Sequence, residues 1–466
     1  MKNSPEFPLI FMALSSIGAV AVCLNSWWTS DELKYGFMDS KVKLVFTDEQ
    51  RLAKIKGFVS EMGVQTVLCR HQNSDKSDEF WNSLLTSKNN ELPRTTIDQD
   101  SDFAVMYTSG STGHPKGVVM THRGAISTLM SWHFGLRVLD VMGLGPVPYV
   151  DKNNQPYQPC QLVSVPFFHV SGTHGGLLLA LWSGTKLVIM KKWDPPEAVR
   201  LIELEKVSRF GGVPTMAAEI LGEAKKVGAK LESIRLIDTG GATRPADQAR
   251  EMAESIPNVL TGTSYGMTET NALGIAIRGK EYLENPEVTG RLIAPLAEMR
   301  IVDEFDNDVE IGDVGELVLK SAANMRCYLN KDAETSEVLK DGWLYTGDLA
   351  KIDKNELITL VDRKKNIIIR GGENISAQEV QTVILEHPDV IEAAIFALPN
   401  ERLGEIVGAC VFCGETSNAD EDSLKEFLRK SLAAYKIPEH IWFKKKPLPR
   451  VASEKIDVEA LKKEYS

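Results

Sequence analysis

The sequence predicts an α/β protein with a large N-terminal domain of parallel-rich sheets covered by helices, followed by a smaller α+β domain. Its 466 residues exceed what one hydrophobic core usually holds, so more than one domain is expected. The composition, 43% hydrophobic and 25% charged residues, is typical of globular proteins. Apolar strand-like runs alternate with amphipathic helical stretches, which indicates parallel sheets covered by helices.

This alternation runs through the first half of the chain. The weakly charged stretch 8–24 is shorter than the ~20 apolar residues of a membrane span, so it predicts a helix followed by a buried strand rather than a transmembrane segment. Further strands are expected at 42–47, 64–69, 186–190, 209–213 and 234–239. Helices are expected at 48–62, 195–206, 215–227 and 245–255. The polar segments 74–100 and 146–159 are typical of surface loops.

The pattern changes at about residue 285. Short, hairpin-like strands at 298–303, 315–320, 350–353 and 357–361 predict a small β subdomain over about 285–362. An α+β segment follows, with strands at 367–369, 393–397 and 407–412 and helices at 377–386 and 420–434. We therefore expect an N-terminal domain at 1–362 and a C-terminal domain at 363–466.

Charge and cysteine usage exclude several classes of protein. A formal net charge of -11 argues against a general nucleic-acid binder, so any polyanionic ligand must be held by a local cluster of donors. Six cysteines are too few for a disulfide scaffold and favour a cytoplasmic location. Cys410 and Cys413 form a CxxC within an apolar run, where residues three apart on a strand point to opposite faces. We interpret this pair as strand core rather than a metal or redox site.

The segment from Tyr107 to Gly117, YTSGSTGHPKG, is the sharpest chemical signal. Glycines let backbone N–H groups approach phosphate oxygens, hydroxyl groups donate further hydrogen bonds, and a lysine adds a point charge. Pro115 and Gly117 stand where a Walker A loop needs Gly and Ser or Thr, so this is a different phosphate loop. The candidate phosphate-binding residues are Thr108, Ser109, Gly110, Ser111, Thr112, Gly113 and Lys116.

Four further motifs follow this loop in order. They are Gly262–Glu269 (GTSYGMTE), Tyr345–Asp348 (YTGD), the pair Asp362-Arg363, and Leu448–Asp457 (LPRVASEKID). Together with the phosphate loop, they resemble the motifs of the adenylate-forming, or AMP-binding, enzymes. This family includes acyl-CoA synthetases, luciferases and peptide-synthetase adenylation domains. The resemblance covers essentially the whole chain and is most similar to the acyl-CoA synthetases.

The resemblance implies a role for each motif in binding ATP and Mg²⁺. Tyr265 and Gly266 would lie against adenine, Thr268 would donate to the α-phosphate, and Glu269 would be the magnesium ligand. Asp348 would bind the ribose hydroxyls with Arg363 nearby. His169 would lie beside the acyl carboxylate. The backbone floor of the nucleotide and acyl sites would be Gly240, Gly241 and Ala242.

The resemblance also implies a mobile C-terminal domain that rotates between two half-reactions. Lys365 matches the hinge, and Lys455 would act in the first half-reaction, in which a carboxylate attacks ATP and pyrophosphate leaves. Gly371 and Gly372 match the segment that lines the CoA tunnel after rotation. A thiol then attacks the acyl-adenylate and AMP leaves, so ATP and CoA are the expected cosubstrates. The sequence leaves a homodimer open.

The expected function is an ATP-dependent acyl-CoA synthetase for a hydrophobic, fatty carboxylic acid, because four aromatic residues suggest an apolar acyl group. These are Trp132, Phe134, Phe167 and Phe168. Two alternatives remain: adenylation of an aryl acid for a carrier protein, and an inactive nucleotide-binding scaffold. The scaffold is motivated by two departures from the family. By comparison with the family, the chain is expected to lack the opening elements of the usual N-terminal domain, and Glu454 stands where the family has glycine before Lys455. Glu454 is expected either to pair with Lys455 or to prevent a turn with positive φ.

Overall fold

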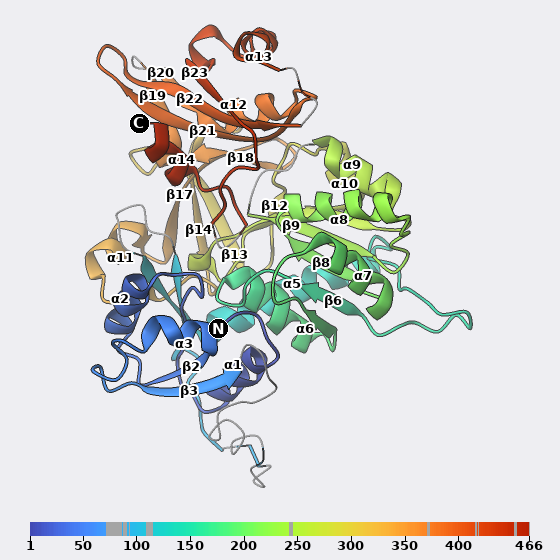
Figure 1. Ribbon diagram of the computed structural model, residues 1–466, viewed down its shortest axis with the longest axis vertical. Helices are drawn as coiled ribbons and strands as arrows, with labels where there is room; N and C mark the ends of the chain where they lie inside the picture. The colour runs from blue at the N-terminus through green and yellow to red at the C-terminus, as the bar shows by residue number, and fades with distance from the viewer. Residues whose placement is uncertain are drawn as a thin grey trace.

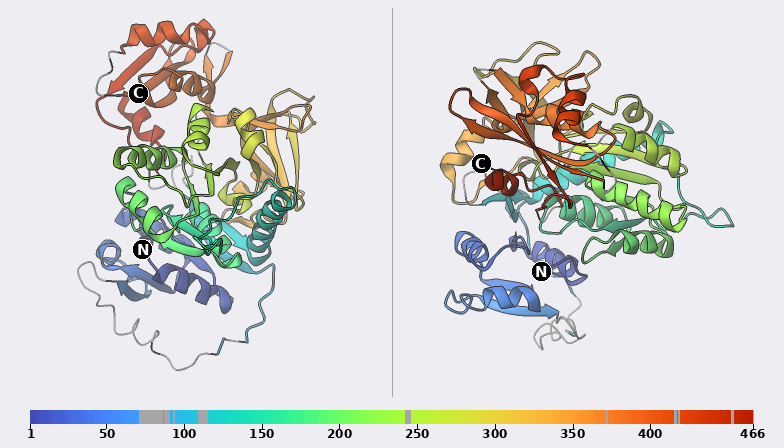
Figure 2. Two further views of the ribbon diagram at one scale, coloured as in Figure 1. Left: turned by 90° about the vertical axis from the view of Figure 1, so that its right-hand side faces the viewer. Right: turned by 45° about the horizontal axis from the view of Figure 1, so that its top comes forward.

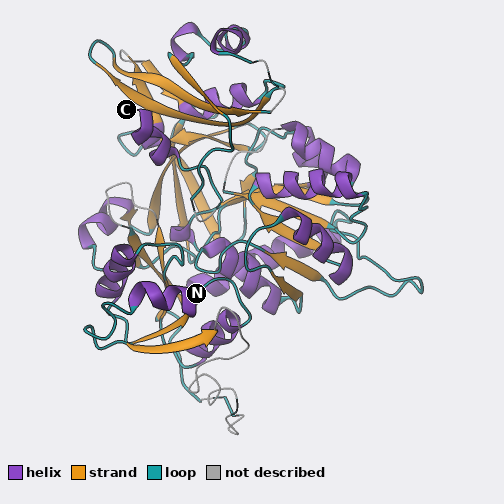
Figure 3. Cartoon of the chain, viewed as in Figure 1, coloured by secondary structure: helices purple, strands orange, loops and turns teal. Residues whose placement is uncertain are grey.

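The computed structural model describes residues 1–70, 86, 91–92, 94–108, 115–241, 246–370, 373–414, 417, 419–451 and 454–465. Figure 1 shows a large N-terminal part, coloured blue to yellow, and a smaller C-terminal part in orange and red at one end. Helices and strands are mixed in both parts, as Figure 3 shows, which confirms the predicted α/β class. Within those described ranges, no helix is long and apolar enough to cross a membrane.

A four-stranded sheet carries both ends of the phosphate loop. Its order is β1 (Ala21–Cys23), β4 (Asp102–Thr108), β5 (Lys116–Thr121) and β15 (Cys327–Tyr328). Helix α1 (Glu6–Ser16) precedes the buried strand β1, so the prediction for the stretch 8–24 is confirmed. Strands β4 and β5 are antiparallel and lead into and out of the loop, as expected.

A separate parallel pair is formed by β2 (Leu44–Asp48) and β3 (Gln65–Arg70). Helix α3 (Glu49–Ile55) is shorter than the predicted helix because the chain continues in turns. The prediction missed α2 (Ser30–Ser40). Its start is fixed by a capping box, in which the Thr29 side chain accepts from the Glu32 N–H and the Glu32 side chain accepts from the Thr29 N–H.

The central seven-stranded sheet has the order β12-β11-β10-β9-β8-β6-β7. Its strands are β6 (Cys160–Val163), β7 (Lys186–Ile189), β8 (Arg209–Gly212), β9 (Leu236–Gly240), β10 (Leu260–Tyr265), β11 (Ile275–Arg278) and β12 (Arg291–Leu292). Strands β6 to β10 are parallel, whereas β11 and β12 are antiparallel additions at one edge. The helices are α5 (His122–Val141), α6 (Leu179–Trp182), α7 (Pro195–Glu205), α8 (Pro214–Val227), α9 (Ala246–Ser255) and the π-helix η1 (Ser171–Leu178).

The two faces of this sheet differ in chemistry. One face packs Leu162, Phe210 and Ile237 into a core with α7 and α8. The other face lies on the side of η1, where Gly176 packs closely on Val163. Strand register places a polar or small set on this second side. We call it the η1 face; its polar and glycine positions are Gln161, Arg209, Gly211, Asp238 and Gly262, and the same register also places Val163 and Leu236 on it.

A β subdomain follows, as predicted, and its strands are antiparallel. It contains β13 (Ala297–Val302), β14 (Gly315–Ser321), β16 (Leu339–Lys340), β17 (Trp343–Ile352) and β18 (Ile358–Arg363). The expected strand at 350–353 is only the end of β17, which begins earlier at Trp343. Helices α10 (Gly279–Glu284) and α11 (Asp332–Val338) flank this region.

The C-terminal part has its own mixed sheet, seen at the top of Figure 1 and in both views of Figure 2. Its strands are β19 (Ile367–Arg370), β20 (Glu373–Ser376), β21 (Val390–Asn400), β22 (Gly404–Cys413) and β23 (His440–Lys444). Its helices are α12 (Ala377–Leu385), α13 (Glu421–Leu428) and α14 (Val458–Tyr465). Helix α13 ends well before residue 434, so that prediction was too long.

Two smaller predictions have different outcomes. Cys410 packs with Leu448 and Leu461 on one side of β22, whereas Cys413 contacts the core on the other side. Both cysteines are free, which confirms the strand-core interpretation. The loop at 146–159 contains only one isolated bridge, between Val150 and Pro156, as expected for a loop. Most of the other expected loop, 74–100, lies outside the described residues.

Candidate active site

The ends of the phosphate loop lie side by side because β4 and β5 pair Thr108 with Lys116. Ser109, Gly110, Ser111, Thr112 and Gly113 lie outside the described residues. Lys116 is placed over the ring of Tyr328, with its Nζ atom 4.9 Å from the ring centroid. This cation–π contact holds the lysine beside β15, which is the edge strand next to β5.

Tyr328 also contacts the predicted magnesium ligand. Its hydroxyl donates to Oε1 of Glu269 at 2.8 Å, and both side chains are buried. Glu269 lies with Thr268 in the short 3₁₀ helix η2 (Thr268–Thr270) that follows β10. Burial raises the pKa of Glu269, while the Tyr328 hydroxyl and the charge of Arg363 oppose that rise. Tyr328 thus joins Lys116 to Glu269, a link that our sequence analysis missed.

The donor set around Glu269 fits a magnesium ion that arrives with a nucleotide. Among the residues the structure describes, no group of three or more His, Cys, Asp or Glu side chains could hold a metal ion. Mg²⁺ is commonly bound by one or two carboxylates together with substrate phosphates and water, rather than by a cage of protein ligands. One buried carboxylate beside the end of a phosphate loop matches that mode.

Three predicted nucleotide residues form one connected group. The Tyr265 hydroxyl donates to Oδ2 of Asp348 at 2.6 Å, and Arg363 Nε lies 3.0 Å from Oδ1 of the same carboxylate. Strand pairing places Asp348 of β17 directly opposite Arg363 of β18. Burial and the Asp348 charge raise the pKa of Tyr265 well above its usual value, so the tyrosine remains a donor.

The glycines at the ends of β9 and β10 lie where side chains do not fit. A Cβ atom on Gly240 would lie 2.7 Å from the carbonyl oxygen of Ser264, and one on Gly266 would lie 2.3 Å from that of Ala272. Gly241 has a φ of +76°, and a Cβ atom on it would lie 3.2 Å from Lys455 Nζ. Lys455 therefore lies directly over this glycine. Ala242 is outside the described residues.

Lys455 and His169, which are far apart in the sequence, lie close enough for their charges to interact. Part of the Lys455 side chain is exposed to solvent, but many protein atoms lie around it. Their desolvation of the ammonium group, together with the charge of Arg363, lowers the pKa of Lys455. Burial and the charge of Lys455 lower the pKa of His169 to about 4, so the imidazole is neutral at neutral pH. Its Nε2 atom is buried and has no hydrogen-bond partner among the described residues.

Glu454 does neither of the two things expected of it. It adopts the left-handed conformation with a φ of +64°, so the turn forms without glycine. Its backbone N–H donates to the carbonyl of Val451, and its own carbonyl accepts from Arg450 Nη1. The carboxylate has Arg450, Glu219 and Lys192 as its charged neighbours, and the described residues contain no ion pair between it and Lys455.

The remaining predicted positions are less informative. Lys365 lies in η3 (Lys364–Asn366), the connection between β18 and β19, and Gly371 and Gly372 lie outside the described residues. Phe167 and Phe168 are buried in a hydrophobic core that Trp132 joins. Phe134 is half exposed on α5. These four aromatic residues are therefore explained by core packing or surface position, which removes the main argument for a fatty acyl pocket.

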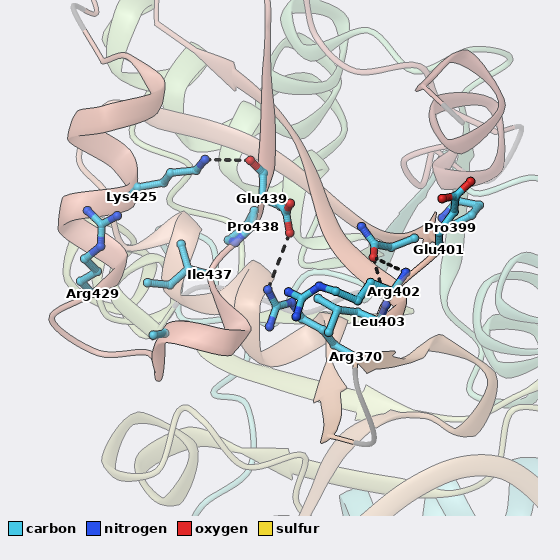
Figure 4. A pocket seen from close by; sticks show the side chains of 12 residues that line it. Arg370, Pro399, Glu401, Arg402, Leu403, Lys425, Arg429, Ile437, Pro438 and Glu439 are labelled. Atoms are coloured by element: carbon cyan, nitrogen blue, oxygen red, sulfur yellow. Dashed lines mark hydrogen bonds and ion pairs between the residues drawn. The ribbon is translucent and has the colours of Figure 1, made fainter.

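A cavity of about 730 Å³ lies entirely within the C-terminal part (Figure 4). Four cationic side chains line it: Arg370, Arg402, Lys425 and Arg429. Arg370 lies 3.7 Å from the Glu439 carboxylate, and Lys425 donates to the Glu439 carbonyl at 2.7 Å. The cavity shares no lining residue with the site around Lys455.

Residues 1–329 match the family model described as AMP-binding enzyme, and residues 379–455 match the AMP-binding enzyme C-terminal domain. A 4-coumarate–CoA ligase of Nicotiana tabacum is 29% identical over 449 residues, which span 95% of this chain and 80% of that protein.

Two solved structures have related folds. The o-succinylbenzoate CoA synthetase of Bacillus subtilis, bound to its acyl-adenylate intermediate, is 26% identical with a TM-score of 0.80; the match covers 99% of this chain and 86% of that one. The fatty acyl CoA synthetase of Mycobacterium tuberculosis is 27% identical with a TM-score of 0.72 and covers 100% and 86%. Since one family model spans more than half of its length, the chain belongs to the AMP-binding enzyme family.

Proposed function

We propose that the protein is an ATP-dependent acid–CoA ligase that forms an acyl-adenylate and then a CoA thioester. The observation that carries this proposal is the position of Lys455 directly over Gly241, close enough to His169 for its charge to lower the pKa of the imidazole. A cation placed over the end of a parallel strand, beside a neutral imidazole, suits the meeting of a carboxylate with a phosphate. The relatives of similar sequence or fold are CoA ligases by name, which agrees with this reaction.

In the first half-reaction, a carboxylate oxygen of the acid attacks the α-phosphorus of ATP. The bond from that phosphorus to the β-phosphate oxygen breaks, and pyrophosphate leaves. Both reactants are anions, so Lys455 lowers the barrier by bridging them, and Thr268 donates to the α-phosphate. His169, being neutral, places its unpartnered Nε2 toward the acid without adding a second charge.

The rest of the nucleotide is held by groups that are already in position. Asp348 accepts from the ribose hydroxyls, Arg363 orients that carboxylate, and Tyr265 lies against adenine. The loop from Thr108 to Lys116 binds the departing phosphates. When bound by Glu269 and phosphate oxygens, Mg²⁺ would supply positive charge that stabilises the leaving pyrophosphate.

In the second half-reaction, the CoA sulfur attacks the acyl carbonyl carbon. The bond to the AMP oxygen breaks, and the thiol proton passes to solvent. We propose that the C-terminal domain, 363–466, rotates about Lys365 so that Lys455 withdraws and Gly371 and Gly372 line the pantetheine path. The position of Lys365 between β18 and β19, in two different sheets, supports this hinge.

The acid is the least constrained part of the proposal. The sequence favours a hydrophobic, fatty acid, but the aromatic residues behind that expectation are core or surface residues. The relatives differ in the acids that their names give: 4-coumarate, o-succinylbenzoate and fatty acids. Adenylation of an aryl acid for a carrier protein is the second enzymatic candidate.

Two assays separate these candidates. Acid-dependent exchange of pyrophosphate into ATP tests adenylation, and thioester formation on added CoA tests the acceptor. A ligase gives both, whereas a carrier-dependent enzyme gives exchange without a CoA thioester. Absence of exchange with fatty, aryl and dicarboxylic acids, in a protein that still binds ATP, would refute the proposed function and leave the scaffold. Lys365→Pro should reduce thioester formation more than exchange.

A further inference from the structure

The η1 face of the central sheet contains a partly buried cation, Arg209, that has no partner among the described residues. Arg209 of β8 lies among Gln161, Asp238 and the end of α5, yet it makes no hydrogen bond or ion pair with any residue the structure describes. The neighbouring Arg278, in contrast, donates two hydrogen bonds to the Asp238 carboxylate, from Nε to Oδ1 at 3.0 Å and from Nη2 to Oδ2 at 2.9 Å. A shielded guanidinium without a counter-ion is costly, so such groups are normally paired.

The nearby carboxylates do not provide that partner. Asp238 is occupied by Arg278, and Asp140 of α5 pairs with Arg137 at 3.0 Å. Burial lowers the pKa of Arg209, while the charges of Asp238 and Asp140 oppose this effect only from a distance. Arg209, Arg278 and Arg137 thus outnumber the two carboxylates, and the local charge is positive.

Two glycines in this region leave room where a side chain would otherwise stand. A Cβ atom on Gly211, two residues after Arg209 in β8, would meet only the Asp238 carbonyl oxygen, at 3.8 Å. On the facing helix η1, a Cβ atom on Gly175 would meet nothing within 4 Å. Gln161, which is level with Arg209 in the sheet, donates to the Gly175 carbonyl at 3.0 Å and fixes the spacing between helix and sheet.

Helix η1 and strand β9, which neighbours β8, both extend from this region toward the proposed reaction centre. Helix η1 begins just after His169, and β9 ends at Gly240, beside Lys455. In the strand register, Arg209 is level with Leu236, four residues before Gly240. At ~3.3 Å per residue, that offset is about 13 Å along the sheet.

We propose that Arg209 is a specificity residue, and that the acid activated by this protein carries a second carboxylate roughly 10 Å from the one that reacts. This proposal rests on the proposed function, because it takes the reacting carboxylate to lie at His169 and Lys455. The substrate class is then a dicarboxylic acid rather than a simple fatty acid. The second carboxylate enters between Gly175 and Gly211 and forms the ion pair that Arg209 lacks.

The test compares acids of equal length. Decanedioate is set against decanoate, and 4-carboxycinnamate against cinnamate, with 4-coumarate as a neutral hydrogen-bonding analogue. We expect the diacids to be favoured in kcat/KM by at least about tenfold, because a site built to bind a polar group discriminates against analogues that lack it. Arg209→Met should abolish this preference by raising KM for the diacids, and Arg209→Lys should restore part of it. Lys186→Met is the matched control. Lys186 lies in β7 of the same sheet and is already paired with Glu205 of α7, so its removal should leave the preference for diacids unchanged.

Calorimetric binding of decanedioate without ATP provides a readout independent of turnover. Binding by the wild type that is lost in Arg209→Met supports the inference even if no thioester forms, in which case only the proposed function fails. Equal or better use of decanoate and cinnamate by the wild type would overturn the inference while the ligase remains. So would a preference for 4-coumarate over 4-carboxycinnamate, or a diacid preference that survives in Arg209→Met.

Discussion

The proposed nucleotide end and the proposed acyl end of the site differ in how many of their polar groups form hydrogen bonds or ion pairs with one another. At the nucleotide end, Tyr265, Asp348 and Arg363 form a closed set of contacts, and Tyr328 joins Glu269 to Lys116. At the acyl end, His169 Nε2 and the Arg209 guanidinium have no partner among the described residues. The polar groups of the first region are already paired with one another, whereas those of the second are not, and our proposals assign them to the acid.

The largest expected effect comes from the residue that lies between the two ends. Lys455→Ala should reduce acid-dependent pyrophosphate exchange by about 10²–10³-fold, because it removes the cation that bridges two anions. Conversion of supplied acyl-adenylate to thioester should change little, since Lys455 has then withdrawn. An equal loss in both half-reactions would contradict the assignment of Lys455 to the first half-reaction alone.

The closed nucleotide set should be sensitive to a single change. Asp348→Asn removes the charge that Arg363 and Tyr265 both contact, and it should raise the KM for ATP by roughly tenfold or more, with a smaller change in the KM for the acid. Tyr265→Phe is the comparison variant. It removes one hydrogen bond to the Asp348 carboxylate but keeps both the carboxylate charge and the aromatic ring, so its effect on the KM for ATP should be smaller. A comparable increase in both KM values for Asp348→Asn would mean that the two ends are not separate.

The Tyr328 link should affect magnesium dependence rather than acid use. Tyr328→Phe removes a hydrogen bond to a charged group, so the magnesium concentration for half-maximal exchange should rise about fivefold. Because the ring remains under Lys116, ATP binding measured by calorimetry without magnesium should stay close to that of the wild type. Tyr157→Phe, on an exposed loop, serves as the control. An unchanged magnesium response would exclude a positioning role for the hydroxyl.

The sequence reveals these two ends unequally. Short contiguous motifs predicted Tyr265, Glu269, Asp348 and Lys455, because each stands in a local pattern of residues. Tyr328 was missed since it acts through the pairing of β15 with β5, which joins segments that are far apart in the chain. Arg209 was missed for the same reason: its isolation becomes visible only when strand register shows what surrounds it.

The fold shows the same limit. The alternation of strands and helices predicted the parallel sheet, because β-strand and helix periodicities are local. Helix α2 was missed because its sequence is mostly polar and its start depends on a capping box at Thr29. The prediction extended α13 beyond Leu428, where the apolar pattern continues but the chain turns.

A smaller effect concerns pH at the acyl end. Because burial keeps the pKa of His169 near 4, below its usual 6.5, the unfolded chain binds this proton first as the pH falls. The contribution of His169 to stability is therefore present above pH 6.5 and is lost as the pH falls toward 4. Chemical denaturation between pH 7 and 4.5 should show a smaller loss of stability in His169→Asn. The same loss in variant and wild type would indicate a normal pKa.

The smallest effect is expected at Glu454. Glu454→Gly should raise the free energy of unfolding by about 1 kcal/mol, because a non-glycine residue with φ of +64° is strained. Its carboxylate faces Arg450, Lys192 and Glu219 rather than Lys455, so the exchange rate should change by less than about threefold. Glu454→Ala separates the two causes, since it removes the charge but keeps the strain. A large gain in exchange for both variants would show that the carboxylate acts on the reaction centre.

The most direct measurement of the central claim follows one oxygen atom. The acid is supplied with its carboxylate labelled with heavy oxygen, and the products of one turnover with ATP and CoA are analysed by mass spectrometry. Attack of the carboxylate on the α-phosphorus predicts one labelled oxygen in AMP for each thioester formed, and none in pyrophosphate. Label in pyrophosphate or phosphate, or release of ADP in place of AMP, would contradict the account.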